Sequence, residues 1–259
     1  MQQVEDRRAE DCARVAIVTG AGSGIGRATA LRLAADGYRV TLAGRRESML
    51  AETAQLIGGS ATLTTVCDVT DADAVRAMTS ATVEEFGRVD VVVNNAGISR
   101  TAPIAEVGIE QWREVMAADV ESIILVTQAA LPSLLERGGS IVNVASVAGL
   151  GGDYAMTSYN AAKGAVVNLT RSLAVELAAQ GVRVNAVAPS LTMTDAVADI
   201  PATDLAAFIA RIPMGRAAEP AEVADVIAFL AGPAARFVTG VVLPVDGGLR
   251  ASSGQPRHR

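Results

Sequence analysis

Short runs of β-branched residues alternate with longer amphipathic segments along almost the whole chain, and this alternation constrains the fold most strongly. In the longer segments apolar residues recur at spacings of three and four, the period of a helix, whereas the short runs are typical of buried strands. Strands are expected at residues 15–19, 39–43, 61–67, 89–94, 140–145, 182–188 and 241–245. Helices are expected at residues 25–36, 47–57, 71–86, 110–136, 158–179 and 221–230. The pattern predicts an α/β fold, a single doubly wound parallel sheet with helices on both faces.

One stretch interrupts the alternation. Residues 190–219 contain Pro201 and Pro213 and only a brief helical pattern at 205–211. Long irregular segments inside compact domains are usually functional, often as lids, so a substrate lid is expected here. The rest of 14–248 shows no linker or repeat and predicts one domain. Residues 1–13 and 249–259 lack apolar periodicity and are expected to be a flexible N-terminal extension and a C-terminal tail.

Composition supports a sheet covered by helices. Half of the 259 residues are apolar but only 3% are aromatic, so the core is expected to consist of Ala, Val, Leu and Ile. The formal net charge is −6 and no lysine- or arginine-rich run is present, which argues against nucleic acid and anionic membranes as partners. A small-molecule partner is therefore expected.

Targeting and metal signals are missing from the sequence. The first residues are acidic and polar rather than typical of a signal peptide, and no apolar run approaches the ~18 residues that span a bilayer. Cys12, Cys67 and His258 have no metal-ligand spacing, so neither a zinc site nor a disulfide framework is expected. We expect a cytoplasmic protein with no membrane partner and no metal.

A glycine-rich turn joins the first expected strand to the first expected helix. Glycines allow a tight turn and a close backbone approach to a pyrophosphate, and the unpaired N–H groups of the helix start favour an anion. We expect that anion over residues 23–25. The alternative is a turn without a ligand, but the number of glycines exceeds what a turn needs, so the motif predicts dinucleotide binding in a Rossmann-type sheet. The glycines are Gly20, Gly22, Gly24 and Gly26.

The end of the second expected strand indicates which dinucleotide binds. An NAD site usually carries a carboxylate there for the adenosine ribose, but Gly44 occupies this place. Arg45 and Arg46 follow, and either side chain is suited to a 2′-phosphate. NADP(H) is therefore the preferred cofactor, with NAD(H) as the alternative if both arginines are ordinary solvated charges. Asp68 is the only other acid near the expected adenine region.

Tyr159 and Lys163 are four residues apart on an expected helix, so they project from one face. A nearby ammonium favours the phenolate form and suits the phenol to proton transfer. The spacing alone also fits an aromatic side chain packed beside a snorkelling lysine. Ser146 closes the strand expected at 140–145, where ligands bind in open α/β sheets, although a serine that starts a turn is the simpler interpretation.

Taken in order, these motifs resemble the short-chain dehydrogenase/reductase family from residue 15 to residue 248. The likeness extends to the turn that starts at Thr19, to the segments 94–97 and 185–189, and to the C-terminal motif 245–248. It implies that Asp68 contacts adenine and that Thr194 holds the carboxamide. With the glycine turn and the arginines, the expected cofactor residues are Gly20, Gly22, Ser23, Gly24, Ile25, Gly26, Arg45, Arg46, Asp68, Val69, Asn95, Ala96, Gly97, Tyr159, Lys163, Pro189 and Thr194.

The resemblance also implies a mechanism. Tyr159 gives a proton to the carbonyl oxygen during reduction, Ser146 stabilises that oxygen, and Lys163 binds the nicotinamide ribose and eases proton release from the tyrosine. Hydride comes from the cofactor, so the protein supplies orientation and electrostatics. Many family members are tetramers, and apolar faces on the expected helices 110–136 and 158–179 suit a homotetramer or dimer.

The sequence departs from the family pattern at two places. Asp119 stands where the family usually has an asparagine that links the lysine to a water chain. A carboxylate there would stabilise the Lys163 ammonium and partly offset its pull on the phenol. If the family asparagine acts through its backbone carbonyl at a helix distortion, Asp119 can replace it. The second departure is Ser190, where glycine is common, and its effect is expected to be small.

The substrate is expected to meet a modest, largely apolar pocket. The loop 151–154, with Asp153 and Tyr154, should line it together with Ile98, Leu191 and the lid. The leading hypothesis is a carbonyl reductase or alcohol dehydrogenase that acts on a cyclic or aryl ketone or a 3-oxoacyl thioester. One alternative is an NAD-dependent dehydrogenase that runs toward oxidation. A remote alternative is a cofactor-binding sensor or scaffold that has lost catalysis.

Overall fold

The computed structural model describes residues 13–58, 62–198 and 200–253. The expected N-terminal extension therefore lies outside the described residues except for residue 13, and so does the end of the expected C-terminal tail. Seven parallel strands form one sheet in the order β3-β2-β1-β4-β5-β6-β7, which confirms the predicted fold class. The strands are β1 (Val15–Thr19), β2 (Arg39–Gly44), β3 (Thr62–Val66), β4 (Val91–Asn94), β5 (Ser140–Val144), β6 (Arg183–Pro189) and β7 (Val242–Val245).

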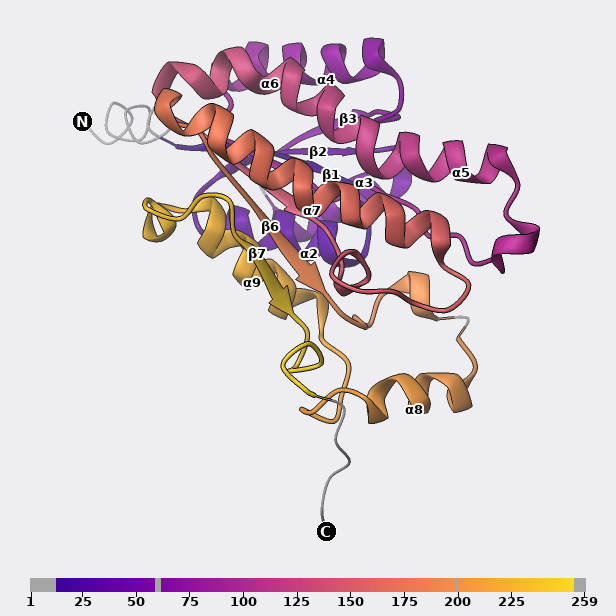
Figure 1. Cartoon of the computed structure of the whole chain (residues 1–259). Coiled ribbons are helices and arrows are strands. Elements are labelled where there is room, and N and C mark those ends of the chain that lie inside the picture. The colour runs from indigo at the N-terminus through magenta and orange to yellow at the C-terminus, as the bar shows by residue number, and fades with distance from the viewer. Residues whose placement is uncertain (1–12, 59–61, 199, 254–259) are drawn as a thin grey trace.

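Helices cover both faces of this sheet (Figure 1). On one face α2 packs against α3 and α9, and on the other α4 packs against α6 and α5 against α7. The alternation of strand and helix predicted this layering, and the boundaries of the strands and of the helices that cover the sheet differ from the expected ones by no more than two residues. The helix in the lid begins three residues earlier than expected. The helices are α2 (Gly24–Ala35), α3 (Glu47–Ile57), α4 (Ala72–Phe86), α5 (Ile109–Met116), α6 (Ser122–Arg137), α7 (Thr157–Leu177), α8 (Ala202–Ala210) and α9 (Pro220–Ala231).

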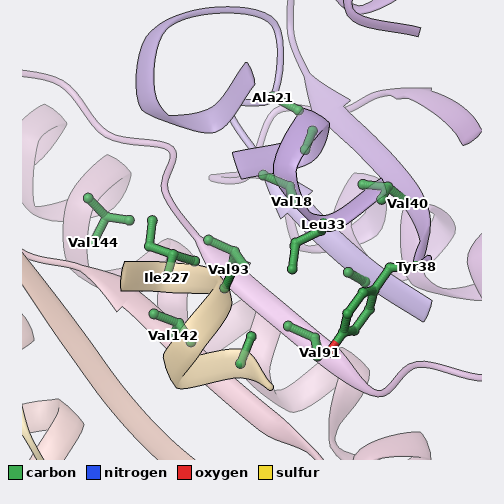
Figure 2. Close-up of a cluster of buried hydrophobic side chains, with 14 of the residues drawn as sticks. Val18, Ala21, Leu33, Tyr38, Val40, Val91, Val93, Val142, Val144 and Ile227 are labelled. Atoms are coloured by element: carbon green, nitrogen blue, oxygen red, sulfur yellow. The ribbon is translucent and has the colours of Figure 1, made fainter. Parts of the chain in front are cut away.

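Successive strand residues supply the two halves of the core. Val18 and Val93 belong to the cluster under α2 and α9, whereas Ile17 and Val92 belong to the cluster under α4 and α6. Strand side chains point alternately to opposite faces, so strands that are apolar throughout fill both layers. Figure 2 shows side chains of the first cluster, with Ile227 of α9 among strand residues. Truncating such a buried isoleucine to alanine typically costs about 2–5 kcal/mol.

The helix predicted at 110–136 is interrupted, and the prediction of one regular helix is wrong in its middle. A π-helical segment, η2 (Ala117–Glu121), separates α5 from α6 and contains Asp119. The Ser122 hydroxyl donates to the Ala118 carbonyl at 2.7 Å. A single inserted residue leaves the apolar pattern on both sides nearly unchanged, so periodicity does not reveal it. Such π-segments are frequent at functional sites.

The combined helix Ile109–Arg137 is long and apolar enough to cross a membrane by length and composition alone. In the fold, however, its residues Val126 and Leu134 are buried in the core, against the sheet and α4. A core helix passes the same test of length and composition. We therefore interpret this segment as a core helix.

The strand order reverses direction between β1 and β4, and ligands bind beside the carboxyl ends of strands at such a point. The segment predicted as a lid begins at this same edge of the sheet. The Met193 N–H donates to the Ala218 carbonyl at 2.8 Å, which closes the lid segment at its base. Helix α8 lies between Met193 and Ala218 in the sequence, has no buried residue and stands apart from the sheet in Figure 1.

Candidate active site

The glycine turn leaves no space for side chains. Gly20 and Gly24 have φ values of +66° and +52°, a region that residues with a Cβ rarely adopt. A Cβ on Gly26 would lie 2.2 Å from the Gly20 carbonyl oxygen and 2.5 Å from Asn95 Nδ2. The Asn95 amide in turn donates to the Thr19 carbonyl at 2.9 Å. The turn is therefore fixed by its own backbone and by the end of β4.

The helix start behind this turn is free to bind an anion. Ser23 is the N-cap of α2, but its side chain makes no capping bond, and the first turn contains no acid. Instead the Ser23 hydroxyl accepts from Arg46 Nη2 at 3.2 Å. Uncapped N–H groups and the positive end of the helix dipole together favour a phosphate. Arg46, which is expected near a 2′-phosphate, thus contacts Ser23, which is expected near the pyrophosphate.

A cavity of about 680 Å³ opens beside this turn. Its lining includes most of the residues predicted for the cofactor, and one predicted for the substrate. These predicted residues are Gly20, Gly22, Ser23, Arg45, Arg46, Asp68, Val69, Asn95, Ala96, Gly97 and Ile98. Gly44, which the sequence placed at the end of the second strand, also lines the cavity. The sequence did not indicate the others, which are Met49, Leu50, Cys67, Thr70, Glu114, Ala117 and Ala118.

Asp68 is held ionised at the wall of this cavity. Hydrogen bonds from the Thr70 N–H at 3.0 Å and hydroxyl at 2.8 Å lower the pKa of its carboxyl group, with a smaller contribution from the charge of Arg45. Cys67 precedes it, and burial raises the pKa of that thiol to about 11. The wall therefore presents an acceptor at Asp68 and a neutral thiol at Cys67.

Lys163 lies in a buried polar cluster at the end of β5. Its Nζ donates to the Val144 carbonyl at 3.0 Å and lies 2.9 Å from Asp119 Oδ2. Only 7% of the lysine side chain and none of the Asp119 side chain is exposed. The other Asp119 oxygen accepts from the Ile98 N–H at 2.7 Å. The π-segment thus joins the lysine to the loop that follows β4.

The charges around Lys163 keep its ammonium protonated. Burial alone would lower the pKa of this group, but the attraction of Tyr159 and of Asp119 outweighs that effect and the pKa is raised. The ammonium nitrogen lies 5.6 Å from the centre of the Tyr159 ring, as expected for two residues one helical turn apart. α7 therefore brings a phenol beside a permanent positive charge.

Ser146 follows β5 and begins the short turn η3 (Val147–Gly149). Its oxygen accepts from the Ala148 N–H at 3.1 Å, and its hydroxyl donates to the Pro189 carbonyl at 3.5 Å. A Cβ on Gly149 would lie 2.4 Å from the Lys163 carbonyl oxygen, so η3 packs tightly on α7. The serine, the lysine helix and the end of β6 meet at one edge of the sheet.

The predicted nicotinamide and substrate residues are less closely packed. The Thr194 side chain lies over the glycine turn, because a Cβ on Gly24 would be 3.0 Å from Thr194 Cγ2. The Leu191 carbonyl accepts from the Ala218 N–H at 3.0 Å. Asp153 is exposed and Tyr154 is 98% exposed, and neither lines the cavity. The structure thus brings Thr194 to the cofactor side but leaves the loop 151–154 open to solvent.

Three residues outside the predicted set hold the site together. The Thr19 hydroxyl oxygen accepts the N–H groups of Asn95 and Ala96, both at 3.0 Å. Arg27 donates to the Gly22 carbonyl at 2.6 Å, and Asn160 donates to the Ala148 carbonyl at 3.2 Å. Thr19 begins the turn that resembles the family's cofactor motif, which is the signal that points to it. Asn160 is indicated only by its place beside Tyr159. Arg27 follows the last glycine of the turn.

Among the described residues, no group of three or more His, Cys, Asp or Glu side chains is placed to hold a metal ion.

Comparison with known proteins agrees with this geometry. The family model described as "Enoyl-(Acyl carrier protein) reductase" matches residues 20–250. Cis-4-hydroxycyclohexanecarboxylate dehydrogenase of Sinomonas cyclohexanicum is 47% identical over 92% of this chain and 97% of that protein. Meso-2,3-butanediol dehydrogenase of Serratia marcescens is 43% identical over 94% of this chain and 97% of that protein.

A solved structure is similar over the same extent. A variant of actinorhodin polyketide ketoreductase with NADPH has a TM-score of 0.87 and 38% identity, covering 92% of this chain and 98% of that one. These relatives are oxidoreductases of secondary alcohols and ketones. The chain is therefore an oxidoreductase and belongs to the short-chain dehydrogenase/reductase family.

Proposed function

We propose that this enzyme interconverts a ketone and a secondary alcohol, prefers NADP(H), and uses Tyr159 as its acid and base. The observation that carries the proposal is the buried ammonium of Lys163, 5.6 Å from the Tyr159 ring, at the carboxyl edge of a sheet whose first turn can accept a pyrophosphate. A lysine that only stabilised the fold would not need a phenol and a phosphate-binding turn at the same edge of the sheet.

The residues present fit the dinucleotide. A Cβ on any of the four glycines would meet neighbouring protein atoms, so the turn keeps its backbone exposed without side chains at these positions, and the N–H groups at the start of α2 have no side-chain cap. Asp68 is suited to the adenine end, and Thr194 lies over the turn toward the nicotinamide end. When bound, the cofactor supplies or accepts the hydride.

The protein's own residues handle the proton. In reduction, Tyr159 donates its proton to the oxygen that the hydride transfer leaves negative, and Ser146 stabilises that oxygen by a hydrogen bond. Lys163 favours the phenolate that remains, because its ammonium cannot lose its charge easily between Asp119 and the Val144 carbonyl. In oxidation the same groups act in reverse.

Asp119 is proposed to substitute for the family asparagine. Asp119 lies in the π-segment, so its backbone departs from regular helical geometry. This is what a role through the backbone carbonyl at a helix distortion requires. Its carboxylate adds what an amide lacks, an ion pair with Lys163 at 2.9 Å. We propose that this pair holds the lysine in place and partly balances its charge.

The preference for NADP(H) rests on Gly44, Arg45 and Arg46. No carboxylate occupies the end of β2, and both arginines line the cavity. An arginine is suited to bidentate contacts with a phosphate. The alternative, an NAD-dependent dehydrogenase, requires both arginines to remain in solvent. Steady-state kinetics with both cofactors distinguishes the two, and a clear preference for NAD would contradict the assignment.

The substrate proposed is a cyclic or aryl ketone, its alcohol, or a 3-oxoacyl thioester. The 47% identical relative is named for a ring alcohol that carries a carboxylate, which favours the cyclic class. Ile98, Asp153, Tyr154 and Leu191 remain the proposed substrate residues. The catalytic domain is proposed to extend over residues 14–248 with its lid at 190–219.

We also propose an oligomeric state and a location for the enzyme. The apolar outer positions of α5, α6 and α7 suit a homotetramer or dimer, and size-exclusion chromatography with light scattering tests this. A cytoplasmic location is supported by Cys67, a buried free thiol. Fractionation of the cells that produce the protein tests the location.

The decisive experiment is a panel of ketones and alcohols assayed by the absorbance of NADPH. We expect turnover of cyclic ketones and a loss of roughly 1,000-fold in kcat for Tyr159→Phe, because the phenyl ring keeps the packing but has no proton to give. Calorimetric binding of NADPH to the variant is the control for folding. Turnover that survives Tyr159→Phe unchanged would contradict the acid and base assignment, and a panel without any turnover would favour the sensor alternative.

A further inference from the structure

The Arg250 side chain reaches from the turn after β7 to the loop between Ser146 and Tyr159. A Cβ on Gly151 would lie 2.6 Å from Arg250 Nη1 and 3.6 Å from its Cζ. The guanidinium group therefore rests directly on the backbone of this loop. Nothing in the sequence indicates the contact, because the two residues are on different segments of the chain.

The backbone of Arg250 is anchored. The buried Asp246 carboxylate accepts the Arg250 N–H at 2.7 Å and the Gly248 N–H at 3.0 Å. The same turn packs beneath the lid, since a Cβ on Gly247 would lie 2.6 Å from Ile212 Cγ2. The backbone position from which the Arg250 side chain extends is therefore fixed by this turn.

The loop beneath the guanidinium is connected to the catalytic helix. Asn160 Nδ2 donates to the Gly151 carbonyl at 3.2 Å and also to the Ala148 carbonyl at 3.2 Å. Asn160 adjoins Tyr159 in the first turns of α7. Arg250, Gly151 and Asn160 thus form a continuous set of contacts that ends beside the proposed acid and base.

The Arg250 guanidinium has no ion pair with any described residue, although it carries a full positive charge. The oxygens of Asp246 are used by backbone N–H groups, and the exposed Asp153 of the loop forms no ion pair with it. Two other arginines at this edge are paired, Arg100 with Glu114 and Arg216 with Glu222. Arg250 therefore has donors available for an external carboxylate.

We propose that Arg250 determines specificity by binding the carboxylate of a keto acid or hydroxy acid whose carbonyl or hydroxyl group reacts at Tyr159. The inference rests on the proposed function, because it assigns a substrate class to that same site. A planar guanidinium matches a carboxylate with two parallel hydrogen bonds. Arg250 is solvent-exposed, so salt screens the attraction and the preference weakens as ionic strength rises.

The test compares two substrates that differ only in charge, 4-oxocyclohexanecarboxylate and its methyl ester. We expect Arg250→Gln to lower the ratio of kcat/KM for the acid to kcat/KM for the ester by about tenfold. Arg250→Lys should keep part of the preference for the acid, because the positive charge remains while the paired donors of the guanidinium group are lost. Arg236→Gln is the matched control. Arg236 is also an exposed arginine, but it lies in a hollow at the amino ends of the strands, which Ser140 and Arg183 also line, and not at the edge that carries the proposed site.

A binding measurement separates this inference from the proposed function. Cyclohexanecarboxylate has no reacting carbonyl, so calorimetric titration into the NADPH-loaded enzyme needs no turnover. We expect Arg250→Gln to weaken this binding by about tenfold and Arg236→Gln to leave it unchanged. If no ketone is reduced but binding still depends on Arg250, the proposed function fails and the anion site stands. Equal losses for acid and ester, or binding independent of Arg250, would overturn the inference.

Discussion

Two parts of the site, which we propose as its cofactor side and its substrate side, share one edge of the sheet but are packed very differently. The cofactor side consists of the glycine turn, the end of β4 and the wall at Asp68, where backbone atoms touch and a single Cβ would clash. The substrate side consists of the loop 151–156 and the lid 190–219, where Tyr154 is 98% exposed and α8 has no buried residue. The comparison indicates that the fold fixes the ligand common to the family and leaves the surface that selects substrates open to variation.

The largest effect expected from this comparison is at Gly26. Gly26→Ala places a Cβ 2.2 Å from the Gly20 carbonyl oxygen, so the turn has to move, and we expect NADPH to bind roughly 100-fold more weakly. Calorimetric titration with NADPH measures this. Gly152→Ala is the matched control on the substrate side, because no heavy atom lies within 4 Å of its Cβ. Similar losses in both variants would abolish the distinction between the two sides.

The next effect concerns the arginine that contacts the glycine turn. Arg46→Gln removes a charge that bonds to Ser23, and we expect the preference for NADPH over NADH to fall roughly tenfold. The expected loss is moderate because the side chain is exposed. The ratio of kcat/KM with the two cofactors is the measurement. Arg76→Gln on the exposed surface of α4 is the control, and an unchanged ratio in Arg46→Gln would assign the 2′-phosphate to another group.

A smaller effect is expected where the two sides meet, at Asp119. Asp119→Asn removes the negative charge that partly balances Lys163, so the ammonium favours phenolate more strongly. We expect the alkaline rise of the oxidation rate to move to lower pH by about half a unit to one unit. The pH profile of kcat/KM is the measurement. An unchanged profile would exclude Asp119 from the proton route, and a shift to higher pH would show that Lys163 itself had lost its charge.

The Lys163 cluster also predicts how stability depends on pH. The pKa of Lys163 is raised in the fold, so its ion pair contributes fully below the unfolded-state pKa of about 10.4 and is lost as the pH rises through the folded-state value. We expect the free energy of unfolding to fall above about pH 10 and to fall less in Asp119→Asn. Denaturant unfolding monitored between pH 8 and pH 11 is the measurement. An equal fall in both proteins would contradict this contribution.

The smallest effect is expected at Tyr154. Its side chain loses almost no packing when truncated because it is 98% exposed, so Tyr154→Ala should change folding stability by no more than about 0.5 kcal/mol. As a proposed substrate residue on a loop open to solvent, Tyr154 can offer only a weakly packed contact, so kcat/KM for the preferred ketone should fall by about twofold. A loss above about tenfold would show that the residue contacts the substrate after the lid has moved.

The sequence predicted the fold closely, and most of the residues that it assigned to the cofactor line one cavity, for identifiable reasons. Strand and helix positions follow from local periodicity, and the glycines reveal a close approach because no other residue tolerates it. The π-segment at Asp119 was missed because one inserted residue hardly alters the apolar pattern. The contact of Arg250 with Gly151 was missed because it joins segments that are distant in the sequence. Arg27 was missed although its partner Gly22 is only five residues away, because an arginine at the start of a helix has no residue pattern that predicts a bond to the preceding turn.

The sequence by itself determined the α/β alternation, the glycine turn between β1 and α2, and the order of Ser146, Tyr159 and Lys163, since each depends on residue type within a short stretch of chain. Only the tertiary structure decided that Asp119 pairs with Lys163 while binding the Ile98 N–H, and that Arg250 rests unpaired on the loop beside the catalytic helix. Whether a charge is paired or buried depends on which groups surround it in space. Strand crossovers bring together residues whose separation along the chain carries no information about that distance.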